Sequence, residues 1–277
     1  MTTTPDPSPD TAALQPAPIV VRKLRWGDPL RWLQAGARDL LAAPGVGLFY
    51  GLSFWGMALL LGWVFRTKPE YVMSLVSGCL LIGPFMAMGL YDTSRRREAG
   101  LAPSLGDSLT CWDSHMGSMG MLVLVLIVLE LLWGRASLVV FAVFFNTGMP
   151  STTGVLQAVF NPQNWEFVAV YTVVGGVFAA LVFSTTVVSI PMILDRDTDA
   201  LTAGITSMRV VFDNTGVMVL WGMLLTLLVV ASLLLAWSVL LVVVGPLLGH
   251  ASWHAYRAAI VPPEAPAPVA EPVQVPA

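Results

Sequence analysis

Long apolar runs recur along this chain, and they constrain its fold more than any other feature. The longest, Gly216–Tyr256, contains no Lys, Arg, Asp or Glu. A helix that spans a bilayer needs about 20 mostly apolar residues, so this run has room for two spans. Only 11% of all residues are charged, well below the share of about 25% in soluble domains. We therefore predict an all-α, polytopic membrane protein.

Six spanning helices account for the apolar runs. The candidates in chain order are Gly45–Phe65, Tyr71–Tyr91, a third that starts at Gly117 and passes Leu132 with apolar character as far as Phe145, Phe167–Leu194, and two helices within Gly216–Tyr256. We place the break between the last two near Ala236–Trp237–Ser238, although no Gly, Pro or Asn marks a turn there.

The basic residues predict the orientation, because Lys and Arg concentrate on cytoplasmic loops. They lie before the first span and after the second, fourth and sixth: Arg22, Lys23, Arg25, Arg31, Arg38, Arg95, Arg96, Arg97, Arg196, Arg209 and Arg257. The opposite side has Arg66 and Lys68, and residues 146–165 contain neither Lys nor Arg. Both termini are therefore predicted to be cytoplasmic. A five-span alternative would place Arg257 outside, which is the less natural arrangement.

An amphipathic segment precedes each of the three predicted hairpins. Apolar residues recur at helical spacing in each segment: Leu201, Ile205, Met208 and Phe212; Leu105, Leu109, Trp112 and Met116; and Leu30, Leu33, Ala37 and Leu40. Such spacing predicts a helix with one apolar stripe. We expect all three helices to lie flat in the headgroup region on the cytoplasmic side.

The hairpins also end alike. Pro84, Pro191 and Pro246 each fall in the last turns of a helix that runs inward, and polar residues that include Asp92 and Asp195 follow. We interpret this as three diverged copies of one unit: an interfacial helix, a span, and a span with a proline kink. The alternative is that prolines and polar residues are simply common at membrane edges.

Two charged residues, Glu130 and Arg135, interrupt the third apolar run. In one interpretation they form an intramembrane pair that lines a pathway, since a charge at mid-bilayer needs a partner or water. In the other, the span ends near Leu132, Trp133–Gly134–Arg135 marks the outer interface, and Ala136–Phe145 is a short surface or re-entrant helix.

The chain has 3 histidines, and the predicted topology places all of them on the cytoplasmic side. His250 and His254 stand four residues apart at the end of the sixth span, and His115 precedes the third. Three imidazoles with a carboxylate would suit a transition metal, and two imidazoles from different helices would suit haem. The alternatives are an interfacial belt with local hydrogen bonds and a proton-coupled role.

The two ends of the chain have the composition of disordered tails. Residues 1–20 are rich in Pro, Thr and Asp, and residues 261–277 are rich in Pro, Ala and Val. Neither segment has enough apolar area to offset the entropy of ordering. We predict a single transmembrane domain over residues 21–260 between these tails.

Two motifs near the C-terminus resemble a known family. They are SIPMILDRDTDALTAGITSMRVVFDN, from Ser189 to Asn214, and GPLLGHASWHAYR, from Gly245 to Arg257. They resemble an uncharacterised family of bacterial integral-membrane proteins, a domain of unknown function with six predicted spans, over about residues 20–260. The resemblance implies a location in the bacterial inner membrane and brings no reaction or ligand. Members are sometimes labelled cytochrome c oxidase subunit I, but this chain has too few spans and histidines for that.

These features lead to a ranked set of functions. The first is a non-enzymatic membrane scaffold or assembly factor that meets the lipid bilayer and another membrane protein complex, or associates with itself. The second is a small-molecule permease, and the third is a metal- or haem-binding protein linked to respiration. The sequence has no nucleophile–base pair or phosphate loop, so we predict no enzymatic activity and no resident cofactor. The formal net charge of −3 gives no indication of nucleic-acid binding.

Overall fold

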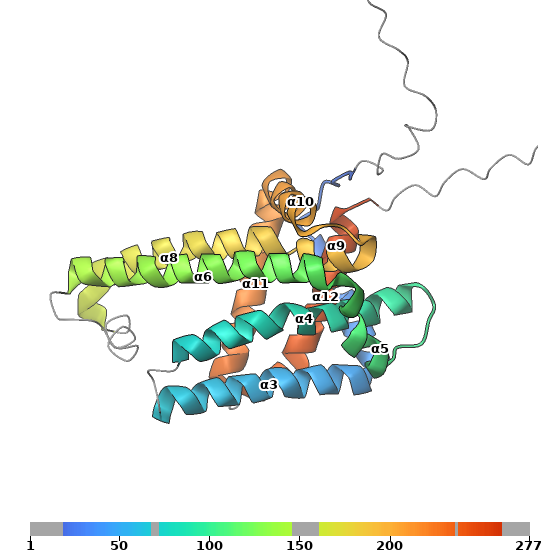
Figure 1. Ribbon diagram of the computed structural model, residues 1–277, viewed down its shortest axis with the longest axis horizontal. Helices are drawn as coiled ribbons and strands as arrows, with labels where there is room; N and C mark the ends of the chain where they lie inside the picture. The colour runs from blue at the N-terminus through green and yellow to red at the C-terminus, as the bar shows by residue number, and fades with distance from the viewer. Residues whose placement is uncertain (1–18, 68–71, 146–160, 236–237, 262–277) are drawn as a thin grey trace, which may run out of the picture.

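The computed structural model describes residues 19–67, 72–145, 161–235 and 238–261, and these residues form an all-α protein (Figure 1). The helices are α2 (Asp28–Ala42), α3 (Pro44–Thr67), α4 (Val72–Glu98), α5 (Leu105–Thr110), α6 (Met116–Phe144), α8 (Trp165–Thr186), α9 (Ser189–Arg196), α10 (Ala200–Asp213), α11 (Thr215–Leu234) and α12 (Leu241–Ala259). The predicted tails and Tyr71 lie outside the described residues, except that Ile19, Val20 and Val261 belong to the folded part.

The predicted hairpins are present. Helix α3 packs on α4, α6 packs on α8, and α11 packs on α12. The last apolar run is split into two helices as predicted: α11 ends at Leu234, α12 begins at Leu241, and Ser238 between them has a φ of 63°. Ala236 and Trp237, the other two residues of the predicted break, lie outside the described part.

Four stretches of the described chain are long and apolar enough to cross a membrane: Pro44–Thr67, Leu105–Phe144, Trp165–Arg196 and Thr215–Leu234. The protein is thus a multi-pass membrane protein. Helices α4 and α12, which the prediction counts as the second and sixth spans, are not among these four. The total of six spans therefore stays a prediction.

Helix α10 turns its apolar stripe outward. Its inner face consists mainly of small residues, and Ala203, Ser207 and Val210 are completely buried against the bundle. The stripe predicted from the sequence lies on the opposite face, where Leu201 and Phe212 are 71% and 70% exposed. Small inner residues allow a close approach of α10 to α8 and α9, and the stripe is left free to face lipid or another protein.

The other two amphipathic segments depart from the expected pattern. The segment from Leu105 to Met116 is not one helix, because α5 stops at Thr110 and a 3₁₀ turn at Asp113–His115 precedes α6. In α2 the buried face carries Trp32, Gly36 and the charged Asp39. Its outward face includes Leu30, which is 61% exposed. Periodicity predicts the position of α2 correctly, and of its predicted apolar stripe Leu30 is exposed whereas Leu33, Ala37 and Leu40 are partly buried.

Helix α6 is continuous from Met116 to Phe144, so Ala136–Phe145 is not a separate surface or re-entrant helix. Gly134 is the sole glycine in this part of α6 and no proline follows it, so nothing in the sequence forces a break. The predicted fourth span does break. It forms α8 and α9, and the interruption at Val187 and Val188 lies just before Pro191. A proline ring clashes with the carbonyl four residues earlier, which is that of Val187.

Helix α12 lies at the centre of the packing, against α2, α3, α4 and α11. Glycines allow its closest contacts. A Cβ on Gly36 would lie 2.7 Å from the backbone nitrogen of Ala251, and one on Gly51 would lie 2.0 Å from the carbonyl oxygen of Val242. Helices α2 and α3 can therefore approach the α12 backbone this closely only because the residues at these two positions are glycines.

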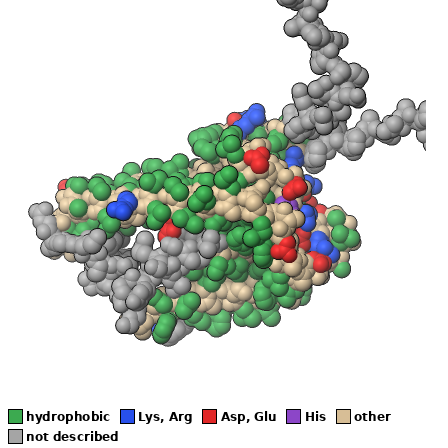
Figure 2. Space-filling model, viewed as in Figure 1, with side chains coloured by type: hydrophobic (Ala, Val, Ile, Leu, Met, Phe, Trp, Pro, Cys, Tyr) green, Lys and Arg blue, Asp and Glu red, His purple; other side chains and the backbone are tan. Residues whose placement is uncertain are grey.

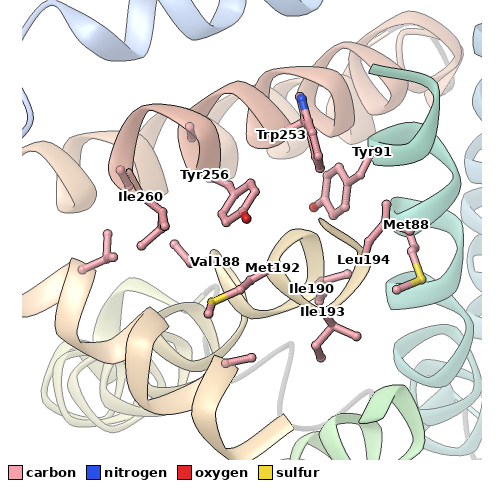
Figure 3. Close-up of a cluster of buried hydrophobic side chains, with 14 of the residues drawn as sticks. Met88, Tyr91, Val188, Ile190, Met192, Ile193, Leu194, Trp253, Tyr256 and Ile260 are labelled. Atoms are coloured by element: carbon pink, nitrogen blue, oxygen red, sulfur yellow. The ribbon is translucent and has the colours of Figure 1, made fainter. Parts of the chain in front are cut away.

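A buried apolar cluster joins α12 to α4 and α9 (Figure 3). Trp253 and Tyr256 of α12 stand over Ile190, Met192 and Leu194 of α9, and Met88 and Tyr91 of α4 close one side. All of the labelled residues are less than 8% exposed. Because α9 is buried along most of its length, the ends of α4, α9 and α12 are held close together.

The two described chain ends meet at this same end of the bundle. Val21 and Ile260 form an isolated antiparallel bridge, and the Arg22 N–H donates to the Ala259 carbonyl at 2.8 Å. Asn214, between α10 and α11, donates to the Arg22 carbonyl at 3.0 Å and accepts from the Leu24 N–H at 2.8 Å. The chain therefore enters and leaves the bundle on one side.

Candidate functional site

Charged side chains gather at the end of the bundle where the chain ends meet, whereas the long flanks of α6 and α8 are mainly apolar (Figure 2). Part of this charge forms one connected set of hydrogen bonds and ion pairs, which we call the polar network. Its members are Asp39 on α2; Ser94, Arg97 and Glu98 on α4; Asp195 and Arg196 on α9; and His250, His254, Tyr256 and Arg257 on α12.

Asp39 is the centre of one half of the network. The residue is 7% exposed. One oxygen accepts from Arg97 Nη1. The other accepts from Ser94 Oγ at 2.6 Å and from His254 Nε2 at 2.8 Å. A buried carboxylate is stable only when it is paired and hydrogen-bonded, and Asp39 meets both conditions through helices α4 and α12.

Burial raises the pKa of Asp39, but hydrogen bonds from His254 and Ser94 and the charges of His254 and Arg97 outweigh it, so the pKa lies below its ordinary value. The carboxylate is consequently ionised at neutral pH. It acts as a fixed negative charge that holds donors from two other helices.

The hydroxyl of Ser94 relays this contact to His250. Ser94 Oγ donates to Asp39 and lies 2.8 Å from His250 Nδ1. A serine has a single hydrogen to donate, so it accepts from His250, whose Nδ1 therefore carries the hydrogen. His250 is completely buried, and its Nε2 has no hydrogen-bond partner among the described residues. His254 is oriented by two acids, since its Nδ1 lies 3.6 Å from Glu98 Oε1.

Asp195 is the centre of the other half. It accepts from the Tyr256 hydroxyl at 2.6 Å and from Arg257 Nη1 at 3.4 Å. Arg196 Nε donates to the same hydroxyl at 3.2 Å. Arg257 also pairs with Glu98 at 3.1 Å, and this contact joins the two halves.

Asp92, which the sequence motif also singles out, lies beside this set. It is 2% exposed and pairs with Arg95 Nη2 at 2.6 Å. Arg95 Nη1 donates to the carbonyl of Leu194 at 2.9 Å, close to the C-terminal end of α9. A cation at a helix C-terminus satisfies free carbonyls and complements the helix dipole.

The structure does not bring the three histidines together. His115 Nδ1 lies 2.9 Å from Ser114 Oγ and 3.1 Å from the Cys111 carbonyl, and its Nε2 lies 3.7 Å from Asp197. Within the described ranges, no three His, Cys, Asp or Glu residues are placed so that they could hold a metal ion. His250 and His254 instead share the environment of Asp39.

Glu130 and Arg135 belong to α6 and are not part of the polar network. Glu130 lines a half-open cavity of about 560 Å³ between α6 and α8, whose other walls include Trp133, Phe178 and Phe183. Arg135 is exposed. Five residues on a helix turn the chain by about 140° beyond a full circle, so the two side chains leave α6 on different faces.

Sequence reasoning found part of this site and missed its centre. Motifs point to His250, His254 and Asp195. Arg97 enters the sequence analysis only as one of the basic residues that predict the orientation in the membrane. Asp39, Ser94 and Glu98 were not identified. Asp39 shares a helical face with Trp32 and Gly36 at spacings of seven and three residues, which is the one signal of its burial in the sequence.

Residues 72–195 match the model of a family described as a predicted integral membrane protein (DUF2189). The match runs from α4 to the end of α9. It includes Ser94, Arg97, Glu98 and Asp195 of the polar network but not Asp39, Arg196 or the α12 residues. No curated protein and no solved structure matches the chain.

Proposed function

We propose that this protein is a non-enzymatic scaffold or accessory factor of the bacterial inner membrane. The chain ends and the polar network lie on its cytoplasmic side, in keeping with the many arginines at that end. One observation carries the proposal: α10 is fixed to the bundle by a buried face and presents Leu201, Ile205 and Phe212 outward.

The polar network supports a structural role rather than a catalytic one. The carboxylates of Asp39, Glu98 and Asp195 each accept from a cation or hydroxyl of the same chain. They join α2, α4, α9 and α12 into one rigid end. A catalytic carboxylate needs reach to a substrate proton, and these oxygens are directed at their own protein partners.

The outward stripe of α10 supports contact with another membrane protein. Exposed apolar patches that stand on a rigid support are typical of interaction sites. The partner in this proposal is a second membrane protein or another copy of this chain, bound beside α10 at the level of the headgroups.

A photo-crosslinking experiment in cells tests this proposal. A photoreactive amino acid at Ile205, which is 59% exposed, is expected to yield a discrete protein adduct. The matched control is Ser207 on the buried face of the same helix, from which only intramolecular products are expected. Two differently tagged copies separate self-association from a distinct partner. Adducts with lipid alone would contradict the scaffold proposal.

A small-molecule permease is the second candidate, and the cavity beside Glu130 favours it. Its volume of about 560 Å³ lies in the range of small-ligand sites, about 300–1,000 Å³. An acid in an apolar cavity is a usual element of a transport path. In this case Glu130→Gln would fail to restore transport to a deletion strain, whereas Arg135→Gln on the exposed face would restore it. Equal transport by both variants and the native protein would exclude the permease.

A further inference from the structure

A second cavity opens at the end of the bundle that holds the polar network. Its volume is about 430 Å³, and the segment before α2, the first turns of α2 and the end of α12 line it. Arg22, Lys23, Arg25 and Arg31 contribute four cations, and Asp28 is the single carboxylate in the lining. The cavity therefore has a strong excess of positive charge.

Contacts within the protein use only part of this charge. Asp28 is already occupied: one oxygen pairs with Arg31 at 3.2 Å and the other accepts from the backbone N–H of Arg25 at 2.7 Å. Lys23 Nζ donates to the Asp213 carbonyl at 2.6 Å. No described residue makes a hydrogen bond or ion pair with the guanidinium of Arg22 or Arg25, and both residues are exposed.

The floor of the cavity is fixed. His254 lines it, and the ring is oriented by Asp39 and Glu98. These two acids are in turn paired with Arg97 and Arg257, so they do not cancel the charge of the cavity. Trp32 forms an apolar wall and packs edge-on against Trp221 at 5.4 Å between ring centroids.

The cavity lies beside side chains that are typical of a membrane interface. Trp26, between Arg25 and α2, is 69% exposed, and Leu30 on α2 is 61% exposed. Lys23 ties the segment to Asp213, next to the exposed Phe212 of α10. Tryptophan and exposed leucines beside clustered arginines are expected at the depth of lipid headgroups.

We propose that this cavity binds the phosphate of an anionic phospholipid from the surrounding leaflet. Arg22 and Arg25 would contact the phosphate, since the planar guanidinium matches phosphate oxygens with two parallel hydrogen bonds. The acyl chains would lie along Trp26 and Leu30. A soluble phosphate shares the headgroup chemistry but would gain nothing from this apolar surface.

Lipid titration of the full chain tests the proposal. The purified, delipidated protein in mild detergent is titrated with short-chain phosphatidylglycerol or phosphatidylcholine, and bound lipid is counted by native mass spectrometry. We expect one phosphatidylglycerol to bind in preference to phosphatidylcholine. The double variant Arg22→Gln/Arg25→Gln is expected to bind it about 30-fold more weakly, from the usual contribution of about 1 kcal/mol for each arginine near an anionic lipid. Thermal stabilisation by the lipid provides a second readout.

The matched control removes the same charge elsewhere. Arg66 and Arg135 are exposed and lie on segments away from the cavity, so Arg66→Gln/Arg135→Gln is expected to retain the native affinity. Equal weakening in both double variants would show a general charge effect and overturn the proposal. Binding of glycerol phosphate or inorganic phosphate as tight as that of phosphatidylglycerol would overturn the lipid assignment.

Discussion

Asp39 links three helices through one buried carboxylate. Arg97, Ser94 and His254 donate to its two oxygens from α4 and α12. A buried ion pair adds little stability compared with an apolar core of the same volume. Removal of one partner is nevertheless costly, because the other charges stay buried without it. The network is therefore most sensitive at this residue.

Replacement of Asp39 by asparagine is our first prediction. Asparagine keeps the shape but removes the charge that faces Arg97 and His254. We expect a loss of about 3 kcal/mol in the free energy of unfolding, the usual effect of breaking a buried ion pair. Denaturation in mixed micelles measures it. The control is Asp199→Asn, because the carboxylate of Asp199 is exposed and only caps α10.

The contribution of the Asp39 charge to stability depends on pH. Because the folded pKa of Asp39 lies below its ordinary value of 3.8, its contribution is complete above that value and is lost as the pH falls through the folded pKa. The difference in stability between native protein and Asp39→Asn should therefore shrink as the pH falls below about 3.8. A difference that stays constant into strong acid would show that the charge of Asp39 is not the cause.

At the scale of single residues, the sequence shows residue type and spacing but not the direction in which a side chain points. Two histidines four residues apart are visible as a pair, and so is an aspartate after a helix-end proline. Asp39 follows Arg38 in a helix with polar residues on several sides, and without the position of α12 it resembles a solvent-facing acid. The structure is needed to show that it points inward.

The contact between α2 and α12 depends on the absence of a side chain. Gly36 lies one turn before Asp39, and its Cα faces the backbone of α12 at Leu247 and Ala251. This close approach brings Asp39 within reach of His254. The hydrogen bond between Asp39 and His254 therefore depends on the close packing of α2 against α12.

Gly36→Ala is our second prediction. The new Cβ would lie 2.7 Å and 2.9 Å from two backbone atoms of α12, which cannot move as a side chain does. We expect a loss of about 1–3 kcal/mol in unfolding free energy, as for other overpacked contacts. Gly56→Ala in α3 is the control, since nothing lies within 4 Å of its added Cβ. Equal stability of both variants would contradict the close contact.

Periodicity predicts the positions of the helices better than it predicts which face of each helix is buried. The stripe on α10 was recognised, but only the structure shows that small residues form its inner face. The sequence predicts a kink at each of three prolines, and before Pro191 the helix is interrupted outright at Val187 and Val188. Pro84 and Pro246 remain inside continuous helices. Tertiary packing decides which of the three prolines ends a helix, and no local pattern contains that information.

The contacts between helix ends bear on the topology of the whole molecule. Asp39 precedes α3 and meets Arg97 at the end of α4, so this hairpin starts and finishes on one side. Arg95 reaches Leu194 at the end of α9, and the bridge of Val21 to Ile260 places the start of the described chain beside the end of α12. Six crossings arranged as three hairpins satisfy these contacts, whereas the five-span alternative does not.

Cysteine labelling distinguishes six spans from four, and this is our third prediction. In a variant without Cys79 and Cys111, single cysteines replace Asn161, Leu235, Leu101 and Asp199, all exposed. With six spans, a membrane-impermeant maleimide should label positions 161 and 235 on spheroplasts, and positions 101 and 199 only after lysis. If α4 and α12 did not cross, α6 would start outside, and the pattern at all four positions would reverse. Thr67 is labelled from outside in either case and serves as the positive control, whereas Val20 should stay protected.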